Sequence, residues 1–163
     1  MIDYTNFTEN VRRTITKSYA LTKEHHYPQI YPLVMMEAIM VEAPDMVQFL
    51  FQYLRIDRAQ FCQLASNYMP EGAELEPTQI PISMQLEQAF VNANAFAHET
   101  GANVVALEHV FYGLIKIHDS IQEIMNSLGV NEMMVREAVL KFREGNTSRT
   151  EDTTESESGS TRN

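Results

Sequence analysis

The sequence is poor in several residue types that particular classes of protein require. It holds one cysteine, Cys62, in 163 residues, so neither an intrachain disulfide nor a cysteine-rich metal site can form. Because Cys62 stands in an apolar stretch, we expect a small buried hydrophobe rather than a reactive thiol. Lysine and arginine number 12 against 22 acidic residues, and the net charge of −10 argues against nucleic-acid and anionic-membrane partners.

Long apolar runs and signal-like segments are also missing. No stretch approaches the roughly 18 apolar residues that a membrane span needs. The first residues, Met1 to Tyr4, lack the basic and apolar regions of a secretory signal, so we expect a cytoplasmic protein.

Motifs for chemistry are absent in the same way. The six glycines are scattered, and none belongs to the Gly-x-x-x-x-Gly-Lys-Ser/Thr loop that cradles ATP phosphates. The five histidines include His98 and His109, whose spacing suits surface or structural roles better than metal ligation. No paired carboxylates or activated nucleophile converge in the pattern. We therefore expect no enzymatic activity, cofactor or metal in this chain.

Self-similarity at an offset of 75 residues is the strongest positive feature. It places Thr8 on Ser83, and each hydroxyl residue precedes apolar residues spaced three and four apart. This pattern predicts the same capped amphipathic helix in both halves. At an offset of 74, Asp57 falls on Asn131, and both are predicted N-caps of a closing helix.

The repeat predicts an all-α fold in which a four-helix unit is duplicated about a pseudo-twofold axis. The expected helices lie at residues 8–25, 32–42, 45–54, 57–69, 83–100, 107–118, 120–128 and 131–143. The repeats span about 7–69 and 82–143 within a domain of residues 1–144, and Pro70, Gly72, Pro77 and Pro81 predict an ordered but irregular crossover between them. Residues 145–163 contain nothing apolar, so we expect a flexible acidic Ser/Thr-rich linker or tail.

The second half carries a family resemblance. Residues 97–115 read AHETGANVVALEHVFYGLI, and residues 128–131 read LGVN. This resembles the Clp repeat, whose pattern runs from a helix through a Gly-His/Asp-Asn turn and an aliphatic pair to Glu-His-Leu-Leu, a Gly/Ala-Leu-Leu run and Leu-Gly-Val-Asp. The first half drifts further: Leu33-Val34 replaces Glu-His, and residues 54–57 read LRID. Over residues 7–143 the chain is similar to the Clp N-terminal domain of ClpA-, ClpB- and ClpC-type AAA+ ATPases.

The resemblance implies a substrate- or adaptor-binding domain at the N-terminus of a hexameric AAA+ unfoldase, either a disaggregase chaperone or the ATP-binding subunit of a Clp protease. Its implied partners are unfolded client polypeptides and adaptor proteins. ATP and Mg would belong to the parent protein, at a site outside this chain. Two alternatives stay open: the N-domain of a ClpV-type type VI secretion ATPase, which binds a sheath-protein helix, and a stand-alone Clp-repeat protein.

The resemblance also points to candidate peptide- or adaptor-binding residues. Glu108 is either a carboxylate that caps the preceding turn or a polar edge of a peptide groove, and Thr8 has the same two interpretations. Phe96, Leu107 and Phe111 are candidates for the apolar part of that groove, with ordinary burial as the alternative. Ala102 replaces a polar or acidic turn residue of the disaggregase branch, which puts charge-dependent contacts there in doubt.

Methionine is unusually frequent, at ten residues. Met35, Met36 and Met40 fall in one predicted helix, and Met133 and Met134 in another. Flexible thioether side chains suit a groove that accepts many peptides, although we expect most of them in the core.

Overall fold

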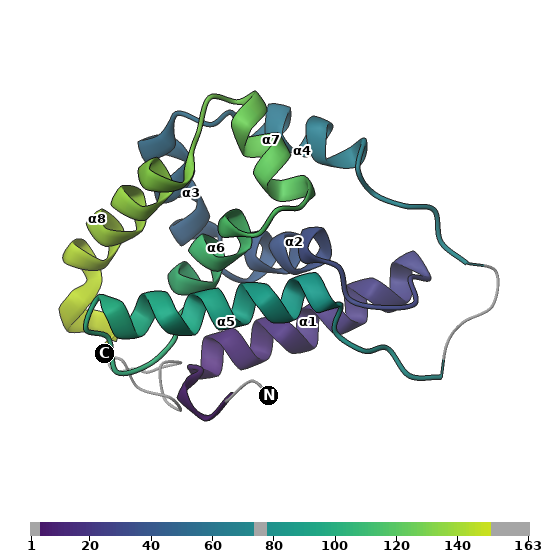
Figure 1. Cartoon of the computed structure of the whole chain (residues 1–163), viewed down its shortest axis with the longest axis horizontal. Helices are drawn as coiled ribbons and strands as arrows, with labels where there is room; N and C mark the ends of the chain where they lie inside the picture. Colours follow the sequence, from purple (N-terminus) through teal and green to yellow (C-terminus); the bar gives the residue numbers. More distant parts are fainter. Residues whose placement is uncertain (1–3, 74–77, 151–163) are drawn as a thin grey trace.

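The computed structural model describes residues 4–73 and 78–150, and helices dominate it (Figure 1). Within these ranges extended backbone pairs only in two isolated β-bridges, which confirms the all-α class. A 3-10 helix, η1 (Tyr4–Asn6), comes first. The α-helices are α1 (Glu9–His25), α2 (Pro32–Glu42), α3 (Pro44–Leu54), α4 (Arg58–Ser66), α5 (Met84–Glu99), α6 (Leu107–Lys116), α7 (Ser120–Ser127) and α8 (Glu132–Thr150).

The helix starts follow the predicted caps. The hydroxyls of Thr8 and Ser83 each accept a hydrogen bond from the backbone N–H three residues later, at 3.2 and 3.1 Å. Asp57 and Asn131 accept backbone N–H groups in the first turns of α4 and α8. Each cap satisfies N–H groups that have no partner inside the helix, so the polar residue fixes where the helix begins.

The helix ends repeat as well. His26 and Gly101 follow α1 and α5 with φ of 62° and 85°, and Arg55 and Gly129 follow α3 and α7 with φ of 60° and 79°. Glycine adopts this left-handed conformation without a Cβ penalty, whereas other residues lose about 1–2 kcal/mol. The first repeat therefore adopts the same backbone conformation as the second, with His26 and Arg55 in place of the glycines.

The two isolated bridges display the pseudo-twofold relation directly. Phe7 pairs with Val105, and Ile30 pairs with Ile82. Adding 75 to 7 gives 82, and adding 75 to 30 gives 105, so each bridge is the image of the other. The segment before the first helix of each half thus pairs with a loop of the other half.

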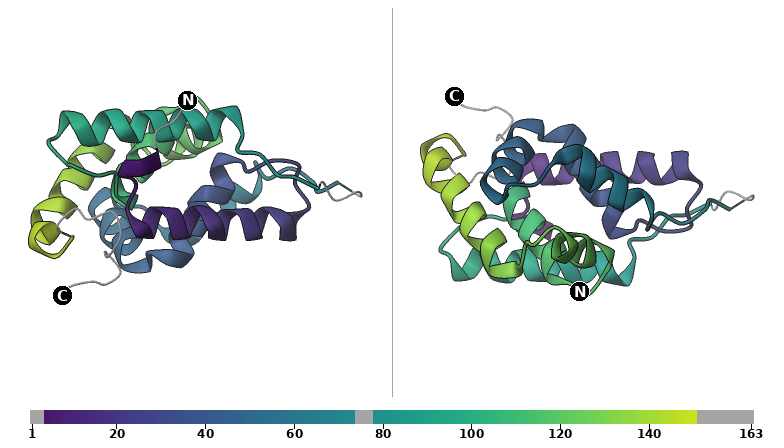
Figure 2. Two further views of the ribbon diagram at one scale, coloured as in Figure 1. Left: turned by 90° about the horizontal axis from the view of Figure 1, so that it is seen from below. Right: turned by 90° about the horizontal axis from the view of Figure 1, so that it is seen from above.

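The remaining contacts interlock the halves further. α3 packs on α8 and α4 packs on α7, so both pairs join one repeat to the other. α2 and α6 lie between the long helices α1 and α5, which Figure 2 shows on opposite sides of the molecule. Eight of the 11 residues of α2 and nine of the 10 of α6 are buried, as expected of central helices that neighbouring helices enclose. The repeats share one core.

α5 and α6 approach each other closely at Gly113. A Cβ added there would lie 2.2 Å from the Ala89 carbonyl oxygen, so only glycine fits this crossing. The matching residue of the first repeat is Ala38, so α1 and α2 leave room for a methyl group where α5 and α6 do not.

Two expectations need correction. α8 continues to Thr150 across Gly145, so the predicted linker begins inside a helix, and its residues 151–163 lie outside the described residues. A helix that is already nucleated extends at little cost, and Asn146 Nδ2 adds a hydrogen bond to the Phe142 carbonyl oxygen at 2.8 Å.

The segment 74–77 of the crossover, with Pro77, also lies outside the described residues.

Cys62 is exposed, so its predicted place in the core is wrong. α4 buries only Phe61, because it packs against α7 along one narrow side. The next residue is turned by about 100° around the helix axis and therefore faces outward.

Candidate functional site

The starts of α1 and α6 meet at one junction. The Thr8 N–H donates to the Val105 carbonyl oxygen at 3.0 Å, and the Val105 N–H donates to the Asn6 carbonyl oxygen at 2.8 Å. These bonds hold Thr8 beside the turn that leads into Leu107 and Glu108. The structure thus brings together three residues that the sequence marked as candidates, although they lie about 100 positions apart.

Thr8 is completely buried at this junction. Its hydroxyl accepts the N–H of Val11 as the N-cap of α1. The side chain therefore stabilises the start of the helix, which is the structural interpretation given above.

Glu108 lies in the first turn of α6, and only 4% of the residue is exposed. Its Oε2 lies 2.5 Å from Arg143 Nη1, so an ion pair joins α6 to α8. A buried carboxylate is costly without such a partner. Glu108 therefore anchors α8, and Arg143 is the ion-pair partner that sequence analysis did not single out.

His109 follows Glu108 and is fully buried. Its Nδ1 accepts the backbone N–H of Ala106 at 2.9 Å, which caps the start of α6 from inside the helix. This is the structural role expected of the histidines. Within the described residues, no three His, Cys, Asp or Glu side chains are grouped as a metal ion would require.

Phe96 and Phe111 belong to the core. Phe96 stacks on Tyr112 with ring centroids 4.1 Å apart, and the Arg136 guanidinium lies 5.3 Å from the Phe96 centroid. Phe111 is fully buried and its ring lies 6.5 Å from that of Phe51 in the first repeat. Both aromatic rings join helices to one another.

All five candidate side chains are nine-tenths or more buried: Thr8, Phe96, Leu107, Glu108 and Phe111. In this conformation a bound peptide could not reach them without displacing neighbouring helices. Their contact with a peptide stays a prediction, while their contribution to the stability of the junction is evident.

Tyr112 is a titratable side chain whose pKa this environment changes. Its hydroxyl donates to Glu132 Oε2 at 2.5 Å. Burial, and then the Glu132 carboxylate, raise the pKa of Tyr112 to about 12. Burial also raises the pKa of Asp119, before α7.

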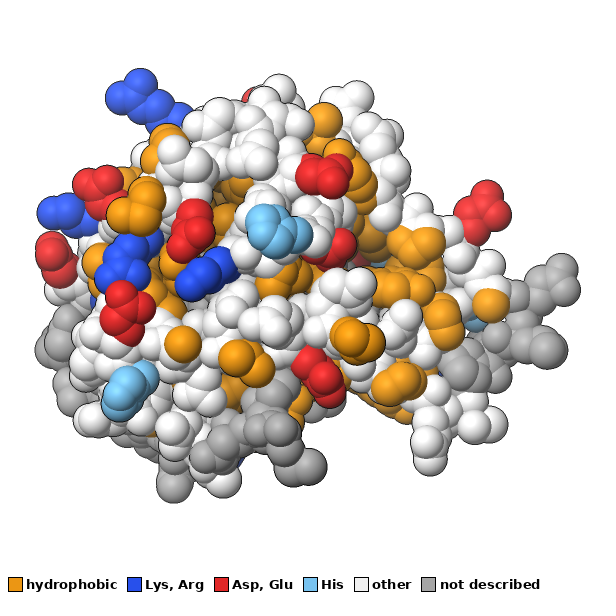
Figure 3. Space-filling view, in the orientation of Figure 1, with side chains coloured by type: hydrophobic (Ala, Val, Ile, Leu, Met, Phe, Trp, Pro, Cys, Tyr) orange, Lys and Arg blue, Asp and Glu red, His pale blue; other side chains and the backbone are white. Residues whose placement is uncertain are grey.

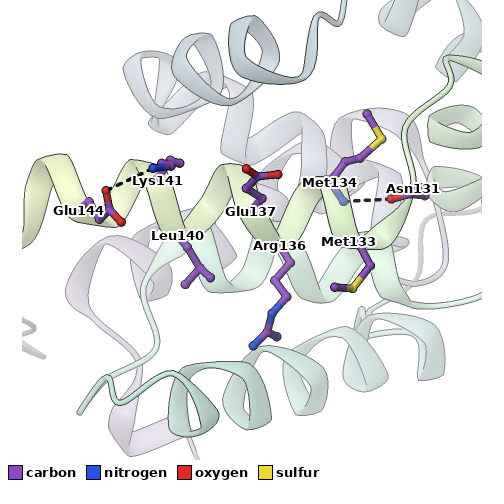
Figure 4. A pocket seen from close by; sticks show the side chains of 8 residues that line it. All are labelled: Asn131, Met133, Met134, Arg136, Glu137, Leu140, Lys141 and Glu144. Carbon is purple, nitrogen blue, oxygen red and sulfur yellow. Dashed lines mark hydrogen bonds and ion pairs between the residues drawn. The ribbon is translucent and has the colours of Figure 1, made fainter.

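Three open hollows lie away from the buried junction. One runs along α8, encloses about 510 Å³ and is drawn in Figure 4, where Arg136 reaches toward α5 and Met134 points the opposite way. A second, also about 510 Å³, lies among the starts of α2, α5 and α7 and contains Tyr68 and Asp119. The third is an apolar groove of about 250 Å³ between α2 and α4.

The surface differs between these regions. Figure 3 shows charged side chains gathered over α8, whereas hydrophobic side chains appear between the helices toward the side of α4 and the crossover. Met35, Met36 and Met40 are buried as expected, whereas Met133 and Met134 are exposed on α8. Accessible apolar surface thus includes these two methionines on α8 and the groove between α2 and α4.

The sequence matches a family model described as the Clp repeat (R) N-terminal domain, over residues 6–128 and again over 81–161. A curated relative, the chaperone protein ClpB of Bacteroides thetaiotaomicron, is 19% identical over 144 residues, which cover 88% of this chain. Those residues make up 17% of that relative, so the chain spans about one sixth of its length. None of the helices described is both long and apolar enough to cross a membrane.

Solved structures agree with this assignment at the level of the fold. The Hsp104 N-terminal domain from Candida albicans superposes with a TM-score of 0.73 at 21% identity, covering 85% of this chain and 91% of that one. A ClpV N-domain in complex with a VipB peptide superposes with a TM-score of 0.65 at 10% identity, covering 82% and 88%. Together with the duplicated helices and the paired bridges, the family match shows that the chain belongs to the Clp repeat N-terminal domain family.

Proposed function

We propose that this chain is the polypeptide-binding N-terminal module of a Clp-type AAA+ unfoldase, which captures clients or adaptors and performs no chemistry itself. The observation that carries the proposal is the family match across both repeats. The ClpV N-domain, which has the same fold, is known in complex with a peptide. Apolar hollows on α8 and between α2 and α4 offer surfaces for such binding.

The partners in this proposal are unfolded client polypeptides and adaptor proteins. The parent protein would supply a hexameric ATPase ring, with ATP and Mg bound outside this chain, and would act in the cytoplasm. The residues from 151 onward would serve as the tether. The curated ClpB relative is several times longer than this chain, which leaves room for such a ring.

A titration followed by nuclear magnetic resonance tests the proposal. The isotope-labelled chain is mixed with a permanently unfolded protein, such as reduced and alkylated α-lactalbumin, with a folded protein of similar charge as control. We expect shifts of a contiguous set of amide signals with the unfolded protein alone. If unfolded proteins and short peptides leave every signal unchanged, the chain is not a polypeptide-binding module.

A second candidate is the N-domain of a ClpV-type ATPase, because ClpV N-domains share this fold. A helical peptide from a type VI sheath protein separates the two. Tight binding of that peptide, with no response to unfolded proteins, would favour the secretion ATPase over a general unfoldase.

A further inference from the structure

The two repeats differ in the contact between their last helix and their second helix. In the second repeat, α8 is 19 residues long and closes firmly onto α6. The Glu108–Arg143 ion pair joins one end of the contact, and the Tyr112–Glu132 hydrogen bond joins the other. Beside this contact, the guanidinium of Arg136 on α8 lies over the Phe96 ring of α5.

Arg136 contacts α5 through its charged end. Its guanidinium lies 5.3 Å from the Phe96 centroid, and its Nη2 lies 3.1 Å from Glu99 Oε2. Figure 4 shows the side chain reaching from α8 toward α5. The second repeat itself thus places a cation here, beside an aromatic ring and a carboxylate.

The first repeat lacks that cation. By the offsets of 75 and 74, Arg136 corresponds to Cys62 and Arg143 corresponds to Met69, while Tyr112 corresponds to Glu37. α4 is only nine residues long. Two arginines and a tyrosine are therefore replaced by smaller or uncharged side chains, and the space between α2 and α4 stays open.

This open space is the groove of about 250 Å³, with a predominantly apolar lining. Met36, Phe61 and Met69 contribute to its walls, and the exposed Cys62 lies where the twin repeat has its arginine. An apolar cavity of about 150 Å³ already holds a benzene molecule, so the groove has room for more than one aliphatic side chain.

One acidic side chain lines the groove. Glu37 lines it and is paired with His25 at 3.1 Å between Nε2 and Oε1, and its side chain is still 40% exposed. This carboxylate favours a positively charged occupant.

We infer that the groove between α2 and α4 binds a polypeptide segment that places an arginine or lysine beside aliphatic residues, next to Cys62, the counterpart of Arg136 in the second repeat. This inference rests on the proposed polypeptide-binding function and specifies a site and a class of ligand for it. The aliphatic side chains would contact the half-buried Ala65 and Met69, and the cation would face Glu37.

The test uses the whole chain and a short synthetic peptide of leucine, alanine and arginine. Two control peptides carry glutamate in place of arginine, or serine in place of leucine. We expect the first peptide to shift amide signals of α2 and α4, and both controls to bind at least roughly tenfold more weakly. Bound peptide should also slow the reaction of Cys62 with a thiol reagent, since Cys62 is the only thiol.

The variant Cys62→Arg makes the groove resemble its twin and should weaken binding by roughly tenfold, because the added side chain occupies the site. Gln63→Arg adds the same charge at the adjacent exposed position, outside the groove lining, and should leave binding unchanged. Both positions are on the surface, so thermal denaturation should show that both variants fold.

The outcomes separate the two proposals. Peptide-induced shifts confined to another surface, with Cys62→Arg still binding normally, would overturn the groove while leaving the polypeptide-binding function in place. Equal binding of the glutamate peptide would overturn the assigned ligand chemistry. Protection of Cys62 by self-association without peptide would identify a second copy of the chain as the occupant instead. No response to any peptide or unfolded protein would overturn both proposals.

Discussion

Breaking the ion pair between Glu108 and Arg143 should destabilise the fold strongly. Their side chains are 5% and 16% exposed, so little solvent screens the pair. Arg143→Ala leaves the carboxylate buried without this cation, a change that costs about 3–5 kcal/mol in comparable sites. In a domain of this size each kcal/mol lowers Tm by about 2–4 °C, so we expect a fall of roughly 6–20 °C.

The first repeat supplies the matched double variant. Leu33 and Met69 occupy the positions that correspond to Glu108 and Arg143, so an apolar pair is compatible with this fold. Glu108→Leu combined with Arg143→Met should therefore recover most of the stability that either single change loses, because no buried charge remains.

Urea denaturation followed by far-ultraviolet circular dichroism measures all four proteins of this cycle. A coupling energy of several kcal/mol is expected. If each single variant loses less than about 1 kcal/mol of stability, or if the losses simply add in the double variant, the pair does not anchor α8.

Three further changes test other parts of the structure. Thr8→Ala removes the α1 cap and should cost about 1 kcal/mol in urea denaturation, whereas Thr16→Ala on the exposed face of the same helix should cost much less. Gly113→Ala should destabilise by about 1–3 kcal/mol although alanine favours helices, because its Cβ would meet the Ala89 carbonyl oxygen; a more stable variant would show that α5 and α6 can separate freely. The pKa of Tyr112 is raised from 10.0 to about 12, so the unfolded chain releases this proton first and stability should fall as pH rises through that interval. Tyr112→Phe should remove one late-titrating tyrosine from the alkaline absorbance titration, and an unchanged titration would contradict the raised pKa.

The sequence predicted the architecture well because capping residues and apolar spacing, which are local features, mark each helix of the repeat. Thr8, Ser83, Asp57 and Asn131 are short polar residues placed immediately before apolar residues at helical spacing, and all four cap helices in the structure. A duplicated pattern also provides an internal check, since the same element is expected twice.

The candidate site was less accessible to such reasoning. Thr8 and Glu108 were recognised, but the role of Glu108 depends on Arg143, which lies 35 residues later in another helix. The groove between α2 and α4 was missed because it results from side chains that the first repeat lacks. The sequence signal for it is the replacement of Arg136 by the smaller Cys62 at the offset of 74.

The sequence by itself determined the number, order and caps of the helices and the relation between the repeats, because these depend on neighbouring residues and on a fixed offset. Only the tertiary structure decided that each repeat pairs with the other through Phe7–Val105 and Ile30–Ile82. Burial likewise depends on how tightly two helices meet. That is why Cys62 faces outward beside an open groove, while Glu108, a charged residue, is enclosed in the core.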